Sequence, residues 1–168
     1  MKQRNVSGFT IVELLIVIVV IGILAAITIV AYNGMQERTR NQQTVAAVSS
    51  YAKAMMLYAA ENGAYPPNSG PWPCLGTGYV CDGTSTLDST AHTQALLNDL
   101  SPYMQSVPQP AVGAQVAQRT GALYAYNYFL FIQEGQSTCP AIGSLTQRQA
   151  PEVSGSDIAC RYNLPDIK

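Results

Sequence analysis

Residues 9–30 of this chain, FTIVELLIVIVVIGILAAITIV, form an apolar run that contains a single carboxylate, Glu13. At a helical rise of about 1.5 Å per residue, the run spans roughly 33 Å, which is about the thickness of the hydrocarbon core of a bilayer. The run therefore predicts a membrane-spanning helix. An ionised carboxylate inside such a helix costs on the order of 3 kcal/mol of insertion free energy, so Glu13 requires a partner or a function.

Two simpler interpretations of this segment have to be weighed. Lys2 and Arg4 precede the run, as in the basic region of a secretory signal peptide. The run is longer than the apolar region of about 7–15 residues in such peptides, it contains Glu13, and no turn residue precedes a cleavage site at its far end. A plain single-pass anchor fits the length of the run but gives no reason for the carboxylate.

The residues around the start of the run carry a family resemblance. Ser7 and Gly8, followed by FTIVELL from Phe9 to Leu15, resemble the processing site and N-terminal motif of type IV pilins and the related pseudopilins. The resemblance implies that a prepilin peptidase cuts after Gly8 on the cytoplasmic side of the membrane, leaving residues 1–8 as a leader peptide. It also implies that Phe9 becomes the N-methylated first residue and that Glu13 takes part in filament assembly.

The resemblance gives Glu13 a physical role. A subunit arriving at a growing filament would bring the amine of its Phe9 to nearly the same membrane depth as Glu13 of a subunit already in place. Opposite charges attract strongly in a low dielectric, whereas either charge alone is costly there. We therefore expect the pair to set the axial register of each added subunit. Head-to-tail contacts between different surfaces do not close, so they generate a helical filament.

The helix is predicted to continue beyond the membrane segment as far as Glu61, because residues 35–60 contain no proline. Apolar side chains recur there at spacings of three and four, which is typical of one face of a helix: Val45, Val48, Ala52, Met55 and Ala59. The sequence NGAYPP that follows, residues 62–67, ends the helix, since glycine can cap it and paired prolines cannot continue it.

Strands are predicted late in the chain. Ala122–Gln133 is the strongest candidate, as one continuous strand with Tyr124, Tyr126, Tyr128, Leu130 and Ile132 on one face and Phe129 and Phe131 on the other. Further strands are expected at Gln115–Gln118, Cys139–Leu145 and Ile158–Leu164, with a short helix at Thr90–Tyr103.

These elements predict an α+β, pilin-like fold in which a long N-terminal helix packs on a C-terminal antiparallel sheet. We expect a leader at residues 1–8, a transmembrane or filament-core helix at residues 9–34, and a globular head at residues 35–168 that includes the amphipathic second half of the helix.

Four cysteines lie beyond the membrane segment, as expected for an oxidising compartment: Cys74, Cys81, Cys139 and Cys160. The sequence permits three pairings, of which Cys74–Cys81 and Cys139–Cys160 are preferred because each closes a local loop. The second bridge also resembles the C-terminal disulfide loop of many pilins. A zinc site is the alternative, but the spacings are not of the close C-x2-4-C type and His92 is the only histidine.

The remaining composition favours a structural protein that is not an enzyme and has no cofactor or metal. Charged residues make up 11% of the chain, the formal net charge is −1, and no nucleophile–histidine–carboxylate pattern or phosphate-binding glycine motif is recognisable. From Met35 onward the chain has seven Lys and Arg residues and nine Asp and Glu residues, so nucleic-acid binding has no electrostatic support.

The sequence thus predicts a type IV pilus subunit that supports adhesion, motility or DNA uptake. Its partners would be itself and related pilins, the prepilin peptidase, an inner-membrane assembly platform, and lipid before assembly. It would start as a single-pass membrane protein with a cytoplasmic N-terminus and end in an extracellular pilus. The alternatives are a pseudopilin of a type II secretion system, in a periplasmic pseudopilus, and an anchored binding protein that never polymerises.

Overall fold

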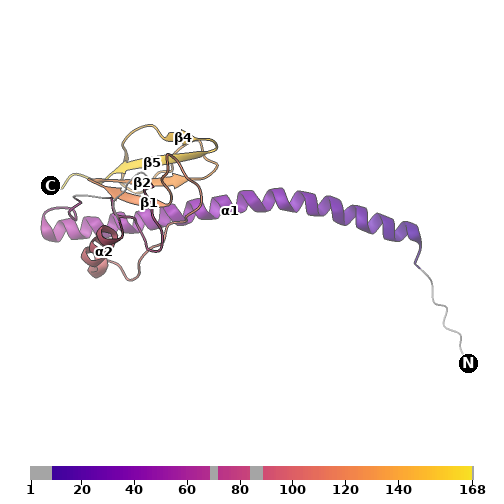
Figure 1. Cartoon of the computed structure of the whole chain (residues 1–168), viewed down its shortest axis with the longest axis horizontal. Coiled ribbons are helices and arrows are strands. Elements are labelled where there is room, and N and C mark those ends of the chain that lie inside the picture. The colour runs from indigo at the N-terminus through magenta and orange to yellow at the C-terminus, as the bar shows by residue number, and fades with distance from the viewer. Residues whose placement is uncertain (1–8, 69–71, 84–88, 168) are drawn as a thin grey trace, which may run out of the picture. The chain divides into compact units, whose positions relative to one another are not determined.

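The computed structural model describes residues 9–68, 72–83 and 89–167 (Figure 1). The chain forms a long helix, a second helix that continues into a 3-10 turn, and then strands. In order, the elements are α1 (Ile11–Asn62), α2 (Ser89–Leu100), η1 (Ser101–Tyr103), β1 (Ala122–Ala125), β2 (Tyr128–Gln133), β3 (Thr146–Gln147), β4 (Glu152–Ser154) and β5 (Asp157–Asn163). The predicted α+β architecture, with a long N-terminal helix and a late antiparallel sheet, is confirmed.

The chain divides into two compact units, Met1–Gln36 and Glu37–Lys168, which we call the helical unit and the globular unit. The described part of the helical unit is the first portion of α1. Its large apolar side chains from Phe9 to Ile29 are 47–86% exposed. Exposed apolar area costs about 25 cal/mol per Å² in water, so this surface requires an apolar environment.

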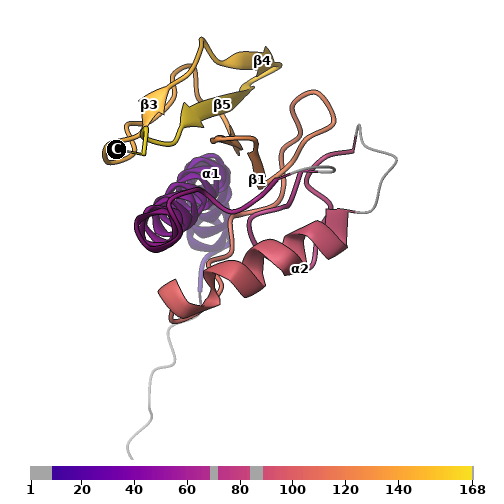
Figure 2. The same ribbon diagram turned by 90° about the vertical axis from the view of Figure 1, so that its left-hand side faces the viewer.

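The globular unit is built around the second portion of α1, with the sheet on one side and α2 on the other (Figure 2). The sheet is antiparallel in the order β1-β2-β5-β3, and β4 pairs with β5. The main core joins all three layers, and its largest fully buried side chains include Tyr51 and Met55 of α1, Leu100 of α2, and Phe129, Phe131 and Ile158 of the sheet. The apolar face predicted on α1 is therefore the face that packs.

The predicted single strand Ala122–Gln133 is wrong, because it is a hairpin. Tyr126 and Asn127 form a two-residue turn between β1 and β2, and Ala125 pairs with Tyr128 across it. Because the chain reverses there, Tyr124 faces the same core as Phe129, while Tyr128, Leu130 and Ile132 face a second cluster that includes the Cys74–Cys81 disulfide. The alternation of side chains continued through the turn and concealed it.

Two other predicted strands are also wrong. Within Gln115–Gln118 only a bridge between Val116 and Arg119 forms, since Ala117 and Gln118 turn the chain with positive φ angles of 50° and 63°. Cys139–Leu145 is a loop, and the neighbouring strand is Thr146–Gln147. The predictions for Ile158–Leu164 and for the short helix at Thr90–Tyr103 agree with β5 and with α2 plus η1 within a few residues.

Helix α1 ends as the sequence predicts. Gly63 adopts a φ of 71°, and its N–H donates to the carbonyl oxygen of Ala59 at 2.8 Å. This left-handed residue is a C-cap that glycine tolerates without a steric cost.

Both preferred disulfides are present, Cys74–Cys81 and Cys139–Cys160, with Cα–Cα distances of 5.5 and 5.7 Å. The Cys139–Cys160 bridge ties the loop before β3 to the middle of β5, and Cys160 is fully buried. It therefore joins two segments that are 21 residues apart in sequence.

Replacing Cys139 and Cys160 together by Ala should lower the free energy of unfolding by roughly 3 kcal/mol, because the unfolded chain gains loop entropy. Urea unfolding of the full chain in detergent, followed by tyrosine and tryptophan fluorescence, measures the change. The matched control is Cys74→Ala with Cys81→Ala, whose shorter loop predicts a smaller entropic loss. If the control variant loses as much free energy of unfolding as the Cys139 and Cys160 variant, or more, the loop-entropy explanation is contradicted.

Candidate functional site

Glu13 lies in the first turn of α1 and contacts the residue that begins the helix. The backbone N–H of Thr10 donates to Oε2 of Glu13 at 2.9 Å, and the Thr10 hydroxyl donates to the same oxygen at 2.8 Å. In return, the N–H of Glu13 donates to Oγ1 of Thr10 at 3.3 Å. Thr10 and Glu13 thus satisfy each other's polar groups at the open end of the helix.

This reciprocal pair is a capping box, in which a Thr at the N-cap and a Glu three residues later bond to each other's backbone N–H. The carboxylate also lies at the positive end of the helix dipole, where negative charge is favoured. Sequence reasoning missed Thr10, although the signal T-x-x-E before an apolar run is present. Glu13 therefore has a local structural role in addition to the assembly role that the resemblance implies.

The predicted processing site is only partly described. Gly8 and the rest of the predicted leader, residues 1–8, lie outside the described residues. Phe9 is described, is 77% exposed, and directly precedes the N-cap residue Thr10. Cleavage after Gly8 and methylation of Phe9 stay predictions, as does the role of Glu13 in assembly.

The apolar part of α1 meets the requirements for crossing a membrane by length and composition. An 18-residue window of α1 has a mean hydropathy of 3.3 and is not buried against any other described part of the chain. The acidic side chain in the first turn of α1 is Glu13. Between residues 9 and 29, the helical unit therefore offers a mainly apolar surface with one charged side chain, Glu13, near its start.

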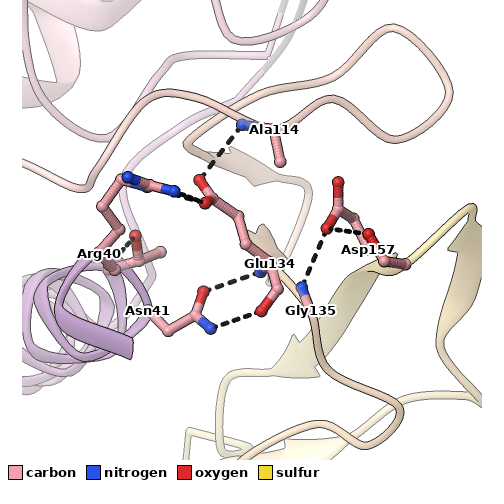
Figure 3. Close-up of polar contacts among 8 residues, drawn as sticks. Arg40, Asn41, Ala114, Glu134, Gly135 and Asp157 are labelled. Atoms are coloured by element: carbon pink, nitrogen blue, oxygen red, sulfur yellow. Dashed lines mark hydrogen bonds and ion pairs between the residues drawn. The ribbon is translucent and has the colours of Figure 1, made fainter. Parts of the chain in front are cut away.

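A second polar arrangement fixes α1 inside the globular unit (Figure 3). The side-chain amide of Asn41 donates to the carbonyl oxygen of Glu134 at 2.8 Å and accepts from the Glu134 N–H at 2.8 Å. Asn41 is only 7% exposed. The Asn41 amide thus pairs with the backbone just after β2 as a neighbouring strand would. Both the N–H and the C=O of Glu134 therefore have a hydrogen-bond partner.

The side chain of Glu134 completes this arrangement, which we call the Asn41–Glu134 clamp. Glu134 Oε2 accepts from Nε of Arg40 at 2.7 Å and also from Nη2, and Oε1 accepts from the N–H of Ala114 at 3.3 Å. The bonds to Glu134, opposed in part by desolvation, raise the pKa of Arg40 above its ordinary value. Next to the clamp, the N–H of Gly135 donates to Asp157 at 3.0 Å (Figure 3).

The clamp connects α1 to the sheet across 93 residues of sequence. Charge-assisted and fully satisfied hydrogen bonds of this kind are geometrically specific. Sequence reasoning missed the clamp because Arg40 and Asn41 match the polar face of an amphipathic helix, and no local pattern links them to Glu134.

Potential metal ligands do not cluster in the part of the chain that the structure describes. Across residues 9–68, 72–83 and 89–167, no three His, Cys, Asp or Glu side chains come together as metal ligands. All four cysteines form disulfides. His92 lies on α2 and is half-buried.

Comparison with known proteins locates the family signal at the start of the chain. Residues 3–29 match the family model described as the prokaryotic N-terminal methylation motif. This segment contains Phe9, Thr10 and Glu13. No solved structure gives a significant match.

Several curated proteins are similar over part of their length. The type II secretion system core protein G of Aeromonas hydrophila is 35% identical over 66 residues, which are 39% of this chain and 46% of that protein. The protein of the same name from Escherichia coli is 35% identical over 65 residues, 39% of this chain and 43% of that protein. The type IV wide pilus major component PilA4 of Thermus thermophilus is 36% identical over 74 residues, 44% of this chain and 56% of that protein.

The chain therefore spans about half the length of the curated relatives that it matches. These relatives include both a type IV pilin and type II secretion proteins, in agreement with the resemblance inferred from residues 7–15. The motif match and the relatives confirm that resemblance: the chain has the prepilin-like N-terminal segment of the type IV pilin and pseudopilin family.

Proposed function

We propose that this chain is a structural subunit of a type IV pilus-like filament, assembled through its N-terminal helix and supporting adhesion, motility or DNA uptake. The observation that carries the proposal is the exposed apolar surface from Phe9 to Ile29, at the start of α1, which contains one carboxylate, Glu13. Before assembly, lipid would cover this surface. In a filament, the same surface of neighbouring subunits would replace the lipid.

The proposal includes the predicted processing steps. A prepilin peptidase would cut after Gly8 and release the leader, residues 1–8, and Phe9 would become the methylated N-terminus. The free amine would then lie next to Thr10 and close to the capping box of its own helix. An incoming amine would meet a Glu13 carboxylate whose orientation the capping box has already set.

The proposed filament function also implies a localisation and a set of partners. The precursor would be a single-pass membrane protein with its N-terminus in the cytoplasm, consistent with Lys2 and Arg4 before the span. An assembly platform in the inner membrane would then transfer it into an extracellular pilus made of this chain and related pilins. The disulfides are consistent with a globular unit on the oxidising side of the membrane.

A pseudopilin of a type II secretion system is the second candidate function. The observation in its favour is that the relatives from Aeromonas hydrophila and Escherichia coli are both named type II secretion system core protein G. In that case the filament would be a short periplasmic pseudopilus. A third candidate, which involves no filament, is a membrane-anchored binding protein that never polymerises.

Mass spectrometry of filaments sheared from native cells tests the proposal. We expect abundant chains that begin at Phe9 and carry a methyl group on its amine. Absence from sheared filaments, with the processed chain retained in the cell envelope, would favour the pseudopilus. An intact leader on all copies of the chain would overturn both filament assignments.

The substitutions Glu13→Ala and Glu13→Gln should each reduce sheared filaments at least tenfold while the level of chain in the membrane stays normal. Glutamine keeps the size of the side chain and its hydrogen-bonding oxygen but removes the charge, so it separates charge pairing from helix capping. Immunoblots of sheared and membrane fractions measure both quantities. The control is Glu37→Gln, the same change in the same helix beyond the apolar run. Normal filaments from the Glu13→Gln chain would contradict the assembly role of the Glu13 charge.

Removing the amide of the clamp by Asn41→Ala should lower the free energy of unfolding by about 2–4 kcal/mol, since it leaves the N–H and C=O of Glu134 without partners. Thermal unfolding of the full chain in detergent, followed by near-UV circular dichroism, measures the loss. The exposed neighbour Gln42 provides the control, and Gln42→Ala is expected to change the free energy of unfolding by less than about 0.5 kcal/mol. Similar stability of the two variants would show that the clamp does not hold α1 to the sheet.

A further inference from the structure

The two ends of strand β2 define two ends of the globular unit. The turn Tyr126–Asn127 comes before β2, and the carbonyl oxygen of Asn127 accepts from the N–H of Leu164 at 2.8 Å. The other end of β2 reaches Gln133 and the Asn41–Glu134 clamp, near the start of the globular part of α1. The six residues of β2 separate these ends by roughly 20 Å at about 3.3 Å per residue.

One end carries an exposed aromatic side chain in a tight turn. Tyr126 is 66% exposed and has a φ of 54°, a conformation that glycine adopts more easily than tyrosine. Its ring packs edge to face against Trp72, with centroids 6.2 Å apart. A large, exposed side chain at a position that favours glycine, in contact with a second aromatic ring, indicates a contact surface.

The opposite end carries a groove beside α1. It has a volume of about 460 Å³, and its lining includes Arg38, Gln42 and Val45 of α1 together with Gln133, Gln136 and Pro140. The lining combines apolar side chains with amide groups, which suits the apolar ring and polar hydroxyl of a tyrosine. Arg38 is exposed and makes no ion pair with any described residue.

One exposed charge at each end is complementary to an exposed charge at the other end. Asp166 follows Leu164 by two residues, so it lies at the Tyr126 end, where it is exposed and makes no ion pair with a described residue. Arg38 lies at the groove end. One copy of the chain thus presents an aromatic side chain and a carboxylate where a second copy would present a groove and a guanidinium.

We propose that Tyr126 of one copy inserts into the groove beside α1 of a second copy, with Asp166 of the first copy facing Arg38 of the second. This inference rests on the proposed filament function and extends it to the globular unit. The two contact surfaces are different and lie at opposite ends, so the contact is heterologous and can be repeated without closing. Each insertion would bury most of the exposed 66% of Tyr126.

Cross-linking between copies tests the geometry. The four native cysteines are all in disulfides, so Gln42→Cys and Asn127→Cys, at the exposed turn residue next to Tyr126, would add the only free thiols and keep the Tyr126 ring. Sheared filaments of the full chain that carries both substitutions are treated with a short bismaleimide and separated on a denaturing gel. We expect a ladder of dimers, trimers and larger species, whereas each single-cysteine chain should give no ladder beyond a dimer.

A charge exchange tests the proposed ion pair. Arg38→Glu and Asp166→Arg should each reduce sheared filaments at least fivefold, and the double variant should recover most of the yield. The control is Lys53→Glu, which reverses an exposed charge on α1 outside the groove and should leave the yield within twofold. Tyr126→Gly removes the inserted ring while relieving the strained φ angle, so it should reduce filaments without lowering the stability of the chain.

The outcomes separate this inference from the proposed function. If the unmodified chain forms filaments but no ladder appears and the charge exchange has no effect, the groove contact is overturned and the filament function stands. If the double charge variant is as poor as the single variants, the ion pair is overturned. If the unmodified chain forms no filaments at all, both the proposed function and this contact fail.

Discussion

A single helix in this chain has to satisfy two different surroundings, and the rest of the structure depends on that constraint. The first portion of α1 exposes apolar side chains on all sides, from Phe9 to Ile29. The second portion exposes polar side chains and buries one apolar stripe between the sheet and α2. Most helical stability in proteins comes from such packing, so the sheet, α2 and the clamp all act on the second portion.

The globular unit uses few charges, and it places them where geometry matters. The carboxylate of Glu134 and the amide of Asn41 occupy a junction where a helix meets the end of a strand, which otherwise leaves backbone groups without partners. Arg161 and Arg119 form ion pairs, at 2.6 and 3.8 Å, with Glu152 of β4, an edge strand of only three residues. Short polar contacts thus hold elements that are too small to be stable through apolar burial alone.

The sequence predicts the long helix, its end at Gly63, the disulfide pairs and the position of β5, because each of these has a local signal. The hairpin at Tyr126 could not be predicted, since tyrosine is not a turn residue and its aromatic neighbours continue a strand-like alternation. The clamp could not be predicted either, because its partners are 93 residues apart. By contrast, the capping box of Thr10 and Glu13 has a local signal, because the spacing T-x-x-E stands directly before an apolar run.

The capping box also has an entropic consequence. A free glutamate side chain loses conformational freedom when it binds a partner, at a cost of about 0.5–1.5 kcal/mol per ordered side chain. In this chain the bonds from Thr10 have already selected one orientation of the Glu13 carboxylate. A cation arriving from another molecule therefore meets a preorganised acceptor. The Glu13 side chain loses its conformational entropy when the first helical turn folds, so binding does not have to order it again.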